Sequence, residues 1–419
     1  PPVPNAPATS WQTSWGNYLI LKNMAFTFMV CFLWWCQLTS LAQVDSSQFK
    51  EPLVLVHYMP WYIAKPYSET WGWHWTMNAF NPEKIQGHKR EIASQFYPLI
   101  GPYDSGDPDV LEYHLLLMKI AGINGIIIDW YGRTDHLDYA ILHKNTEKMV
   151  GKAKEFGILF SICYEDQTIP KLVEAGKVPV DGKVTHAIGE IDWLQKTWFQ
   201  EPNYLRHQGR PVFQSFGFEG LTDMEWVQVL KSRKNPPLYL GQHIQRMGAQ
   251  GAFDWPVPKE YPSSLEKFYQ LANSWKVYMP VAFPRFDDIY EKGKAQKSLG
   301  RISDNQGKTF RYSLDRSFAS KAPFVQIATW NDWGEGTSIE PSREFMYRDL
   351  EILQSYRPES SRQSVMAFQL PGRLYILRKL QLGKPELIQK LDVISEHLKK
   401  TEIQQAKKLL DELAFKEVP

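Results

Sequence analysis

The chain has 419 residues, which is enough for a large hydrophobic core and for an α/β barrel of roughly 250 residues as one unit. Lysine and arginine number 48 and aspartate and glutamate 46, so the formal charge of +2 exerts no long-range attraction on nucleic acid or an anionic membrane. We therefore expect no nucleic-acid partner, no membrane contact beyond a possible N-terminal anchor, and a monomer.

The first 42 residues read as a disordered extension followed by a signal peptide. Residues 24–42 are almost uncharged and apolar, and the run ends in Ser40-Leu41-Ala42, a small-x-small pattern typical of signal-peptide cleavage. This pattern predicts export to the periplasm, the cell surface or the medium of a bacterium, with an uncleaved anchor as the alternative. Cys163 is the only cysteine beyond the run, so no disulfide is expected in the mature chain.

Residues 50–356 alternate short apolar runs with longer segments of helical period, a pattern typical of parallel strands joined by crossover helices. Strands are predicted at 53–58, 123–129, 158–164, 211–216, 238–242, 251–255, 277–282 and 324–330. Helices are predicted at 108–121, 138–156, 189–200, 222–233, 263–274, about 308–320, and 344–355. The fold class is therefore α/β, a (β/α)₈ TIM-type barrel. The crossover between residues 242 and 251 is too short to predict a helix there.

Catalytic groups of such barrels lie at the C-terminal ends of the strands, on one face. Here those ends carry polar or aromatic residues: His57-Tyr58, Asp129-Trp130-Tyr131, Tyr164-Glu165-Asp166, Phe216-Gly217, Gln242-His243, Asp254-Trp255, and Asp332 with Glu335. For Asp129, structural support of the next loop is as good an explanation as substrate binding. For His243, a buried position in the core is as good an explanation as substrate binding. The long segment 59–107 predicts a lid or binding wall, and Trp71, Trp73 and Trp75 in it form either an aromatic wall or a local core.

The stretch 324–341 contains the main candidates for catalytic residues. An apolar strand is followed at once by Asp332 and Glu335, set among Trp330, Trp333 and glycines that allow a sharp turn. Two carboxyl groups that converge on one ligand can protonate a leaving oxygen and activate a nucleophile, and indole rings offer flat faces on which sugars stack. The alternative is that Asp332 caps the following helix and Glu335 is merely exposed.

The composition changes after residue 356. We expect a polar linker at 357–371 and a helical extension at 372–419, with two amphipathic helices joined near Lys400-Thr401-Glu402. These helices are expected to pack on the barrel or on each other. The ten histidines show no zinc-site spacing, and no phosphate-cradling glycine loop precedes a helix, so neither a metal nor another cofactor is expected.

Together these motifs resemble glycoside hydrolase family 99, which comprises endo-acting α-mannosidases and α-mannanases on a metal-free (β/α)₈ barrel. The resemblance spans about residues 50–356 and is carried by residues 57–61, 129–132, 164–166 and, most specifically, 330–337 with Ile339-Glu340. It implies an oligosaccharide or polysaccharide substrate with internal α-linked bonds.

The resemblance also implies roles for individual residues. Glu335 matches the general acid that protonates the departing oxygen, and Asp332 matches the base that acts on the sugar 2-hydroxyl to close an anhydro-sugar intermediate. Tyr58 and Trp130 match aromatic positions around the sugars. The full set of residues expected to contact the substrate is Tyr58, Trp61, Trp130, Tyr131, Tyr164, Glu165, Asp166, His243, Trp255, Trp330, Asn331 and Trp333.

At one catalytic position the chain departs from the family, which has Glu where this chain has Asp332. The Asp form of the motif is similar to glycoside hydrolase family 71, the inverting α-1,3-glucanases. Inverting enzymes separate their carboxyl groups by about 6.5–9.5 Å, against about 5–5.5 Å in ordinary retaining enzymes, and a shorter side chain favours the wider gap. An inverting glucanase-like hydrolase, a carbohydrate-binding barrel without turnover, and an envelope-assembly protein with a partner on its C-terminal helices remain alternatives.

Overall fold

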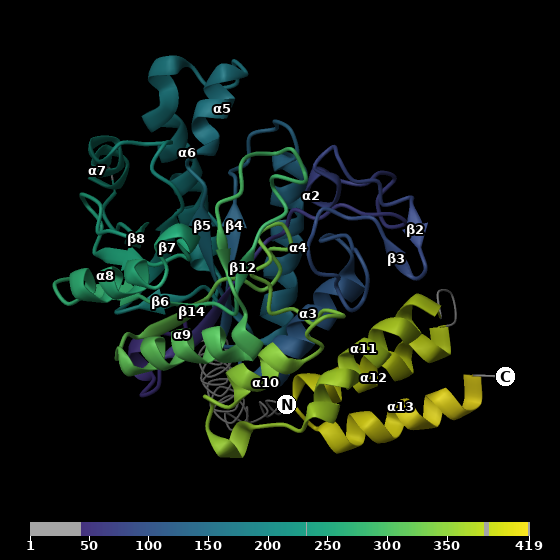
Figure 1. The fold of residues 1–419 in the computed structure, drawn as a ribbon. Coiled ribbons are helices and arrows are strands. Elements are labelled where there is room, and N and C mark those ends of the chain that lie inside the picture. The colour runs from purple at the N-terminus through teal and green to yellow at the C-terminus, as the bar shows by residue number, and fades with distance from the viewer. Residues whose placement is uncertain (1–42, 232, 381–384, 418–419) are drawn as a thin grey trace, which may run out of the picture. The chain divides into compact units, whose positions relative to one another are not determined.

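One sheet of parallel strands forms the centre of the fold in the computed structural model, which describes residues 43–231, 233–380 and 385–417 (Figure 1). In spatial order the sheet runs β10-β9-β8-β7-β5-β4-β1-β14-β11, and every neighbouring pair is parallel. The strands are β1 (Leu53–Tyr58), β4 (Gly125–Trp130), β5 (Leu159–Tyr164), β7 (Arg210–Ser215), β8 (Leu238–Gln242), β9 (Gly251–Phe253), β10 (Val277–Met279), β11 (Val281–Ala282) and β14 (Phe324–Ile327).

The sheet curls into a barrel because its two end strands are halves of one segment. β10 pairs with β9 and β11 pairs with β14, and only Pro280 separates β10 from β11. Proline has no N–H for a ladder, but the Pro280 carbonyl accepts a hydrogen bond from the Gln326 N–H at 3.0 Å. The predicted (β/α)₈ fold class is confirmed, and each predicted strand overlaps an observed one.

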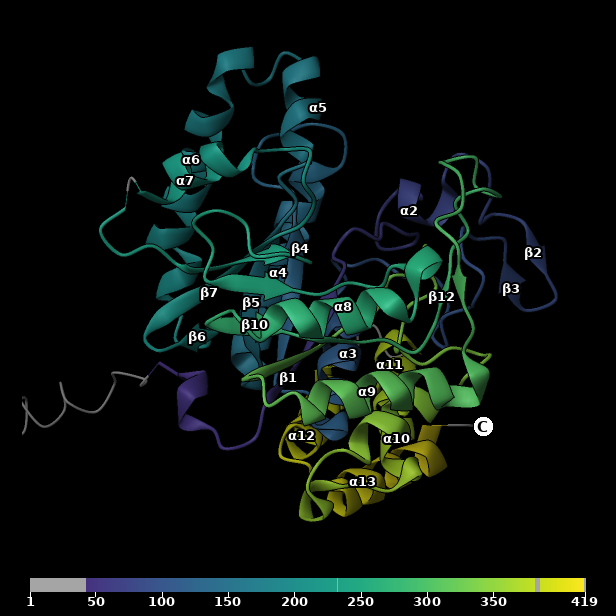
Figure 2. The same cartoon turned by 60° about the vertical axis from the view of Figure 1, so that its left-hand side comes forward.

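Helices cover the outside of the barrel, and Figure 2 shows α8 and α9 running along it. The helices of the barrel are α3 (Pro108–Ala121), α4 (Tyr139–Phe156), α5 (Thr168–Glu174), α6 (Lys183–Lys196), α7 (Asp223–Lys231), α8 (Ser263–Ala272), α9 (Lys308–Ala319) and α10 (Arg348–Gln354). α6 begins six residues before its predicted start at 189, and the short α5 precedes it. The short connection between β8 and β9 contains no helix.

Helix α3 shows how local chemistry sets the ends of an element. The Asp107 side chain accepts a hydrogen bond from the Asp109 N–H, and Pro108 takes the first helical position, where a missing N–H costs nothing. Gly122 ends the helix with φ of +77°, a conformation that glycine adopts without strain. The helix therefore begins and ends where the sequence predicts.

Smaller elements build the loops. The long first loop holds α2 (Trp73–Thr76) and a hairpin of β2 (Ile85–Gln86) and β3 (Lys89–Arg90), and β6 (Arg206–His207) pairs antiparallel with β7. The loop between β11 and α9 holds the hairpin of β12 (Phe286–Asp287) and β13 (Arg301–Ile302). The first and the last of these loops reach the carboxyl ends of the strands.

Three helices follow the barrel, where the sequence analysis expected a linker and two helices. They are α11 (Val365–Leu380), α12 (Pro385–Lys399) and α13 (Ile403–Glu417). The predicted linker at 357–371 is wrong from Val365 onward, because α11 buries Phe368 and Leu374 against the barrel and is stabilised by tertiary packing. Arg378 pairs with Glu112 of α3, and the Lys379 ammonium lies 2.6 Å from the Asp107 carboxylate.

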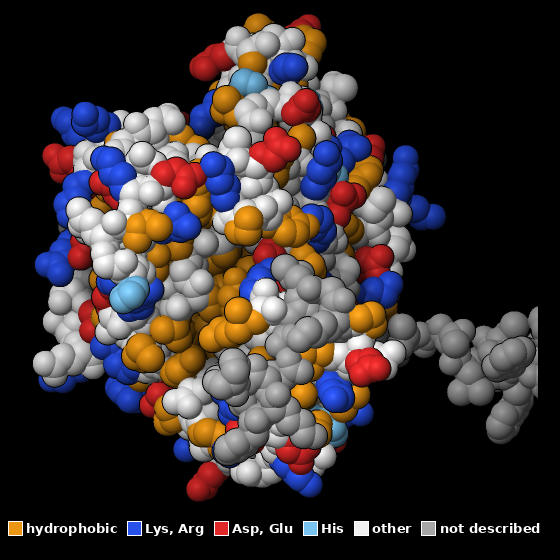
Figure 3. Space-filling model, turned by 90° about the vertical axis from the view of Figure 1, so that its right-hand side faces the viewer, with side chains coloured by type: hydrophobic (Ala, Val, Ile, Leu, Met, Phe, Trp, Pro, Cys, Tyr) orange, Lys and Arg blue, Asp and Glu red, His pale blue; other side chains and the backbone are white. Residues whose placement is uncertain are grey.

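The surface carries both signs of charge. On the face shown in Figure 3, basic and acidic side chains are interspersed rather than gathered by sign. None of the helices in the described ranges is long and apolar enough to span a membrane. The predicted signal peptide at 24–42 and the extension before it lie outside the described residues.

Candidate active site

The turn after β14 presents Asp332 and Glu335. The Thr329 hydroxyl accepts a hydrogen bond from the Asp332 N–H at 2.7 Å, and Asp332 Oδ1 accepts one from the Glu335 N–H at 2.9 Å. Gly336 has φ of +67°, and a Cβ there would lie 2.6 Å from the Asp287 carbonyl oxygen. The turn is therefore tight, and only glycine fits at its last position.

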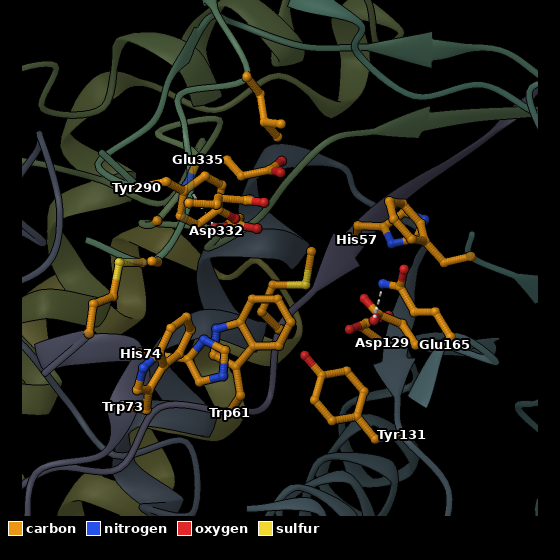
Figure 4. A pocket seen from close by; sticks show the side chains of 18 of the residues that line it. His57, Trp61, Trp73, His74, Asp129, Tyr131, Glu165, Tyr290, Asp332 and Glu335 are labelled. Atoms are coloured by element: carbon orange, nitrogen blue, oxygen red, sulfur yellow. Dashed lines mark hydrogen bonds between the residues drawn. The ribbon is translucent and has the colours of Figure 1, made fainter. Parts of the chain in front are cut away.

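The loop between β11 and α9 holds this turn from the other side. The Asp287 N–H donates to the Glu335 carbonyl and the Ile289 N–H to the Gly334 carbonyl, both at 2.9 Å. Tyr290, from the same loop, lies beside the two acids (Figure 4). Two loops far apart in sequence thus fix the backbone that carries the carboxyl groups.

Asp332 and Glu335 face a cavity of about 600 Å³ at the carboxyl ends of the strands. A hollow of this size lies within the range of small-molecule and sugar sites. Its lining combines acids, amides and large aromatic rings: His57, Met59, Trp61, Tyr62, Trp73, His74, Met77, Asp129, Tyr131, Glu165, Gln167, Lys171, Phe216, Trp255, Tyr290, Ala295, Gln296, Leu299, Asp332, Gly334 and Glu335.

Burial separates the two acids in their affinity for a proton. It raises the pKa of Asp332 to about 6, although the N–H groups of Glu335 and Gly334 favour its ionised form. Burial raises the pKa of Glu335 well above its ordinary value, and the charge of Asp332 raises it further. Glu335 therefore holds its proton more tightly than Asp332 does, which is the order expected of an acid and a base.

A second pair of acids lies across the cavity. Asp129 is the second-last residue of β4 and Glu165 follows β5, and Figure 4 shows them together, away from Asp332 and Glu335. Burial and then the charge of Glu165 raise the pKa of Asp129, and burial raises that of Glu165. The Gln167 amide donates to Glu165 Oε2 at 2.7 Å. This wall therefore offers both hydrogen-bond donors and acceptors to a ligand.

Aromatic rings form the wall between the two acidic pairs. Trp61 stacks on His74 with ring centres 4.3 Å apart and planes 8° apart, and Trp73 meets His74 edge to face. Trp73 is 41% exposed and stands at the mouth of the cavity. Flat rings of this kind pack against the C–H faces of sugars.

His57 is a neutral part of the lining. It is buried, and burial lowers its pKa to about 3, while its Nε2 lies 3.2 Å from Gln326 Oε1. Its ring meets Trp255 edge to face at 4.7 Å. Because His57 carries no charge at neutral pH, it stabilises neither ionised acid by ion pairing.

Comparison with known proteins identifies the family. A sequence model described as glycosyl hydrolase family 99 matches residues 51–238. A glycoprotein endo-alpha-1,2-mannosidase-like protein of Mus musculus is 34% identical over 308 residues, which cover 68% of this chain and 65% of that protein. The chain belongs to glycosyl hydrolase family 99.

Other members agree with this assignment. The glycoprotein endo-alpha-1,2-mannosidase of Mus musculus is 24% identical over 276 residues, and the match covers 60% of this chain and 57% of that protein. The solved family 99 endo-alpha-mannosidase of Bacteroides thetaiotaomicron superposes with a TM-score of 0.56 at 18% identity, covering 76% of this chain and 98% of that one. That structure shares the fold, and the family resemblance predicted from the motifs is confirmed.

The structure brings only some of the predicted site residues to the cavity. Asp332 and Glu335 line it, and so do four of the predicted binding residues: Trp61, Tyr131, Glu165 and Trp255. The eight that do not are Tyr58, Trp130, Tyr164, Asp166, His243, Trp330, Asn331 and Trp333. Not every residue of the family motifs therefore lines this cavity.

Several of these residues form a buried network beneath the acids. The Tyr103 hydroxyl donates to Glu340 Oε2 at 2.6 Å and accepts hydrogen bonds from the Asn331 amide and the Trp333 indole, each at 3.2 Å. His114 connects Tyr58 to Glu340, with N···O distances of 3.1 Å on both sides. The network holds the turn of Asp332, so these residues position the acids rather than contact the cavity.

The remaining residues lie in the core or in another pocket. Trp130 packs against Trp193 and Trp198, Tyr164 packs against Trp130, and Trp330 packs against His114. Asp166 accepts hydrogen bonds from the Trp226 indole at 2.9 Å and the Leu221 N–H at 3.1 Å. His243 lines a separate pocket with Asp254. None of these side chains lines the main cavity, because each is held by the packing or hydrogen-bond partners named here.

Other lining residues were absent from the predicted set. Tyr62 donates its hydroxyl to the Asn331 carbonyl at 2.9 Å and accepts the Trp333 N–H at 3.0 Å. Tyr290 comes from the connection between residues 282 and 308, whose length is itself a sign of a functional loop. Lys171 comes from α5 and Gln167 immediately precedes that helix, for which the sequence analysis proposed no element.

Proposed function

We propose that the protein is an endo-acting glycoside hydrolase that cleaves α-mannosidic bonds, with Glu335 as general acid and Asp332 as base. The observation that supports this proposal is the placement of both acids on one cavity with unequal affinities for a proton. The family relatives named above are endo-alpha-mannosidases, which favours an α-mannoside as the substrate class.

In the proposed reaction the protonated Glu335 donates its proton to the oxygen of the leaving sugar as the glycosidic bond breaks. The ionised Asp332 removes the proton of the 2-hydroxyl, whose oxygen attacks the anomeric carbon and closes an anhydro-sugar. Glu335, now ionised, then removes a proton from water, whose oxygen attacks the anomeric carbon and opens the anhydro-sugar. Asp332 returns its proton to the departing 2-oxygen, which restores the first protonation state of both acids. The net result is one added water and retained configuration.

The opposite wall would hold the sugar during these steps. Asp129, Glu165 and Gln167 offer hydrogen-bond partners to hydroxyl groups, and Trp61 offers a flat face. Positioning of this kind supplies a large share of catalysis, and an error of about 1 Å can cost a hundredfold in rate. Because the Asp332 side chain is shorter than the family's glutamate, the substrate must sit closer to the turn that carries Asp332.

The test is cleavage of α-1,2-linked mannan and of other α-linked glycans by the purified protein, with analysis of the first anomer formed. We expect an internal cut, the retained anomer, and loss of at least about a thousandfold in rate for Glu335→Gln. Glu69→Gln, a change at an exposed acid outside the cavity, is the control. Full activity of Glu335→Gln would refute the mechanism, an inverted first product would indicate direct attack by water, and binding without turnover would indicate a non-catalytic barrel.

A further inference from the structure

A second pocket lies at the same rim of the barrel, between α8 and the segment that follows β8. It has a volume of about 270 Å³, less than half that of the main cavity. Helix α8 contributes Ser264, Phe268 and Leu271 to its lining, and the segments after β8 and β9 contribute His243 and Asp254. This combination matches a sugar ring, which has apolar C–H faces and polar hydroxyl edges.

Asp254 and His243 form the polar centre of this pocket. Asp254 is buried, and its Oδ1 lies 3.1 Å from His243 Nδ1. With Nδ1 donating to the carboxylate, the His243 Nε2 is left as an acceptor without a hydrogen-bond partner among the described residues, on a side chain that is 30% exposed. Glu260 and Lys267 add one further acceptor and one further donor.

The backbone holds this pair rigidly. His243 has φ of +59°, a conformation rare for residues other than glycine, and its N–H donates to the Phe253 carbonyl at 2.7 Å. The Asp254 N–H donates to the Met279 carbonyl at 3.0 Å, and its own carbonyl accepts the Gln326 amide. Strained residues that the surrounding structure holds in place are frequent at ligand sites.

The pocket adjoins the main cavity through one strand end. Trp255 lines the main cavity and Asp254, the preceding residue, lines the second pocket. Side chains of consecutive residues in an extended segment point to opposite sides, so Trp255 and Asp254 turn toward different hollows. A glycan of several sugars that occupies the main cavity would pass over this segment to enter the second pocket.

We propose that the pocket of His243 and Asp254 is a remote carbohydrate subsite, which binds a neutral sugar unit of the same glycan that the acids cleave. The inference rests on the proposed function. In it, His243 Nε2 accepts a hydrogen bond from a sugar hydroxyl, and Phe268 and Leu271 pack against the ring. The subsite raises the affinity for long or branched glycans and takes no part in bond cleavage.

The test compares two substrates, a short α-mannan tetrasaccharide and a long α-mannan. For His243→Ala we expect the KM for the long glycan to rise about three- to tenfold, as for loss of one or two hydrogen bonds, with kcat and the tetrasaccharide kinetics unchanged. His243→Gln keeps a hydrogen-bond acceptor, so its KM for the long glycan should lie between the values of the unmodified protein and of His243→Ala. His88→Ala, at an exposed histidine outside both pockets, is the control. An unchanged KM for the long glycan, or an equal change for both substrates, would overturn the proposal.

A binding measurement separates this proposal from the proposed function. Histidine-labelled Glu335→Gln protein is titrated with α-mannan fragments, and the His243 imidazole signals are followed by NMR. We expect these signals to shift, and a lack of shift with any fragment would overturn the subsite. If the unmodified protein cleaves neither substrate, the proposed function fails and the titration alone decides whether the pocket binds sugar.

Discussion

The two acidic walls of the cavity are built in different ways. Asp332 and Glu335 sit on one tight turn, where backbone N–H groups hold Asp332 and a second loop holds the Glu335 carbonyl. Asp129 lies in β4 and Glu165 follows the neighbouring β5; burial and then Glu165 raise the pKa of Asp129, whereas the hydrogen bond with Asp129 lowers the pKa of Glu165 against the effect of burial, and Gln167 adds one amide donor. The first wall separates two acids of unequal proton affinity, whereas the second pairs Asp129 with Glu165 through a hydrogen bond.

The same substitution on the two walls should therefore have unequal effects. Asp332→Asn removes the base, and we expect cleavage of the α-mannan to fall about a hundred- to a thousandfold. The Asn side-chain oxygen can still accept the Glu335 N–H, so the turn should keep its shape. Steady-state kinetics with an α-mannan checks this, and activity within threefold of the unmodified protein would remove Asp332 from the mechanism.

Asp332→Asn should also raise stability at neutral pH. The native state raises the pKa of Asp332 from 3.8 to about 6, so its contribution to the free energy of unfolding is complete below about pH 4 and is lost as pH rises through 6. That difference corresponds to at most about 3 kcal/mol. Denaturant unfolding at pH 7.5 should show a more stable variant, and at pH 4 the difference should vanish.

The pH dependence of the unmodified enzyme sharpens the contrast. The proposed mechanism needs an ionised Asp332 and a protonated Glu335, so kcat/KM should fall about tenfold per pH unit below an apparent pKa near 6. A second fall is expected at higher pH, where Glu335 loses its proton, and both values belong to the pair. A flat profile between pH 4 and pH 7 would contradict the assigned roles.

The mouth of the cavity should respond more weakly than the acids. Trp73→Ala removes a half-exposed stacking face, and we expect KM to rise about three- to tenfold with little change in kcat. Trp73→Phe keeps a ring and serves as the matched control. A fall in kcat with constant KM would place Trp73 in the chemical step instead.

The smallest effect is expected on the second wall. Asp129→Asn replaces a carboxyl group whose pKa is raised by burial and by Glu165 with an amide of the same shape, which can also donate to Glu165. Activity at pH 7 should therefore stay within about threefold of the unmodified enzyme. A loss as large as that of Asp332→Asn would show that Asp129 acts in its ionised form.

Much of the fold could be predicted because its signals are short-range. The cap at Asp107, the proline at 108 and the glycine at 122 lie next to the helix whose ends they set. The apolar strands are continuous runs because parallel strands are buried on both faces. α11 escaped prediction because its residues favour a helix only when packed on α3, a contact far away in sequence.

The sequence by itself determined the order of strands and helices, the turn that carries Asp332 and Glu335, and the family. Only the tertiary structure decided which residue of each strand end meets the cavity: His57 and not Tyr58, Asp129 and not Trp130, Trp255 and not Asp254. Successive side chains along a strand point to opposite faces, and neighbouring strands and helices decide which face is the open one. A motif of adjacent residues is therefore divided between a cavity wall and the packing behind it.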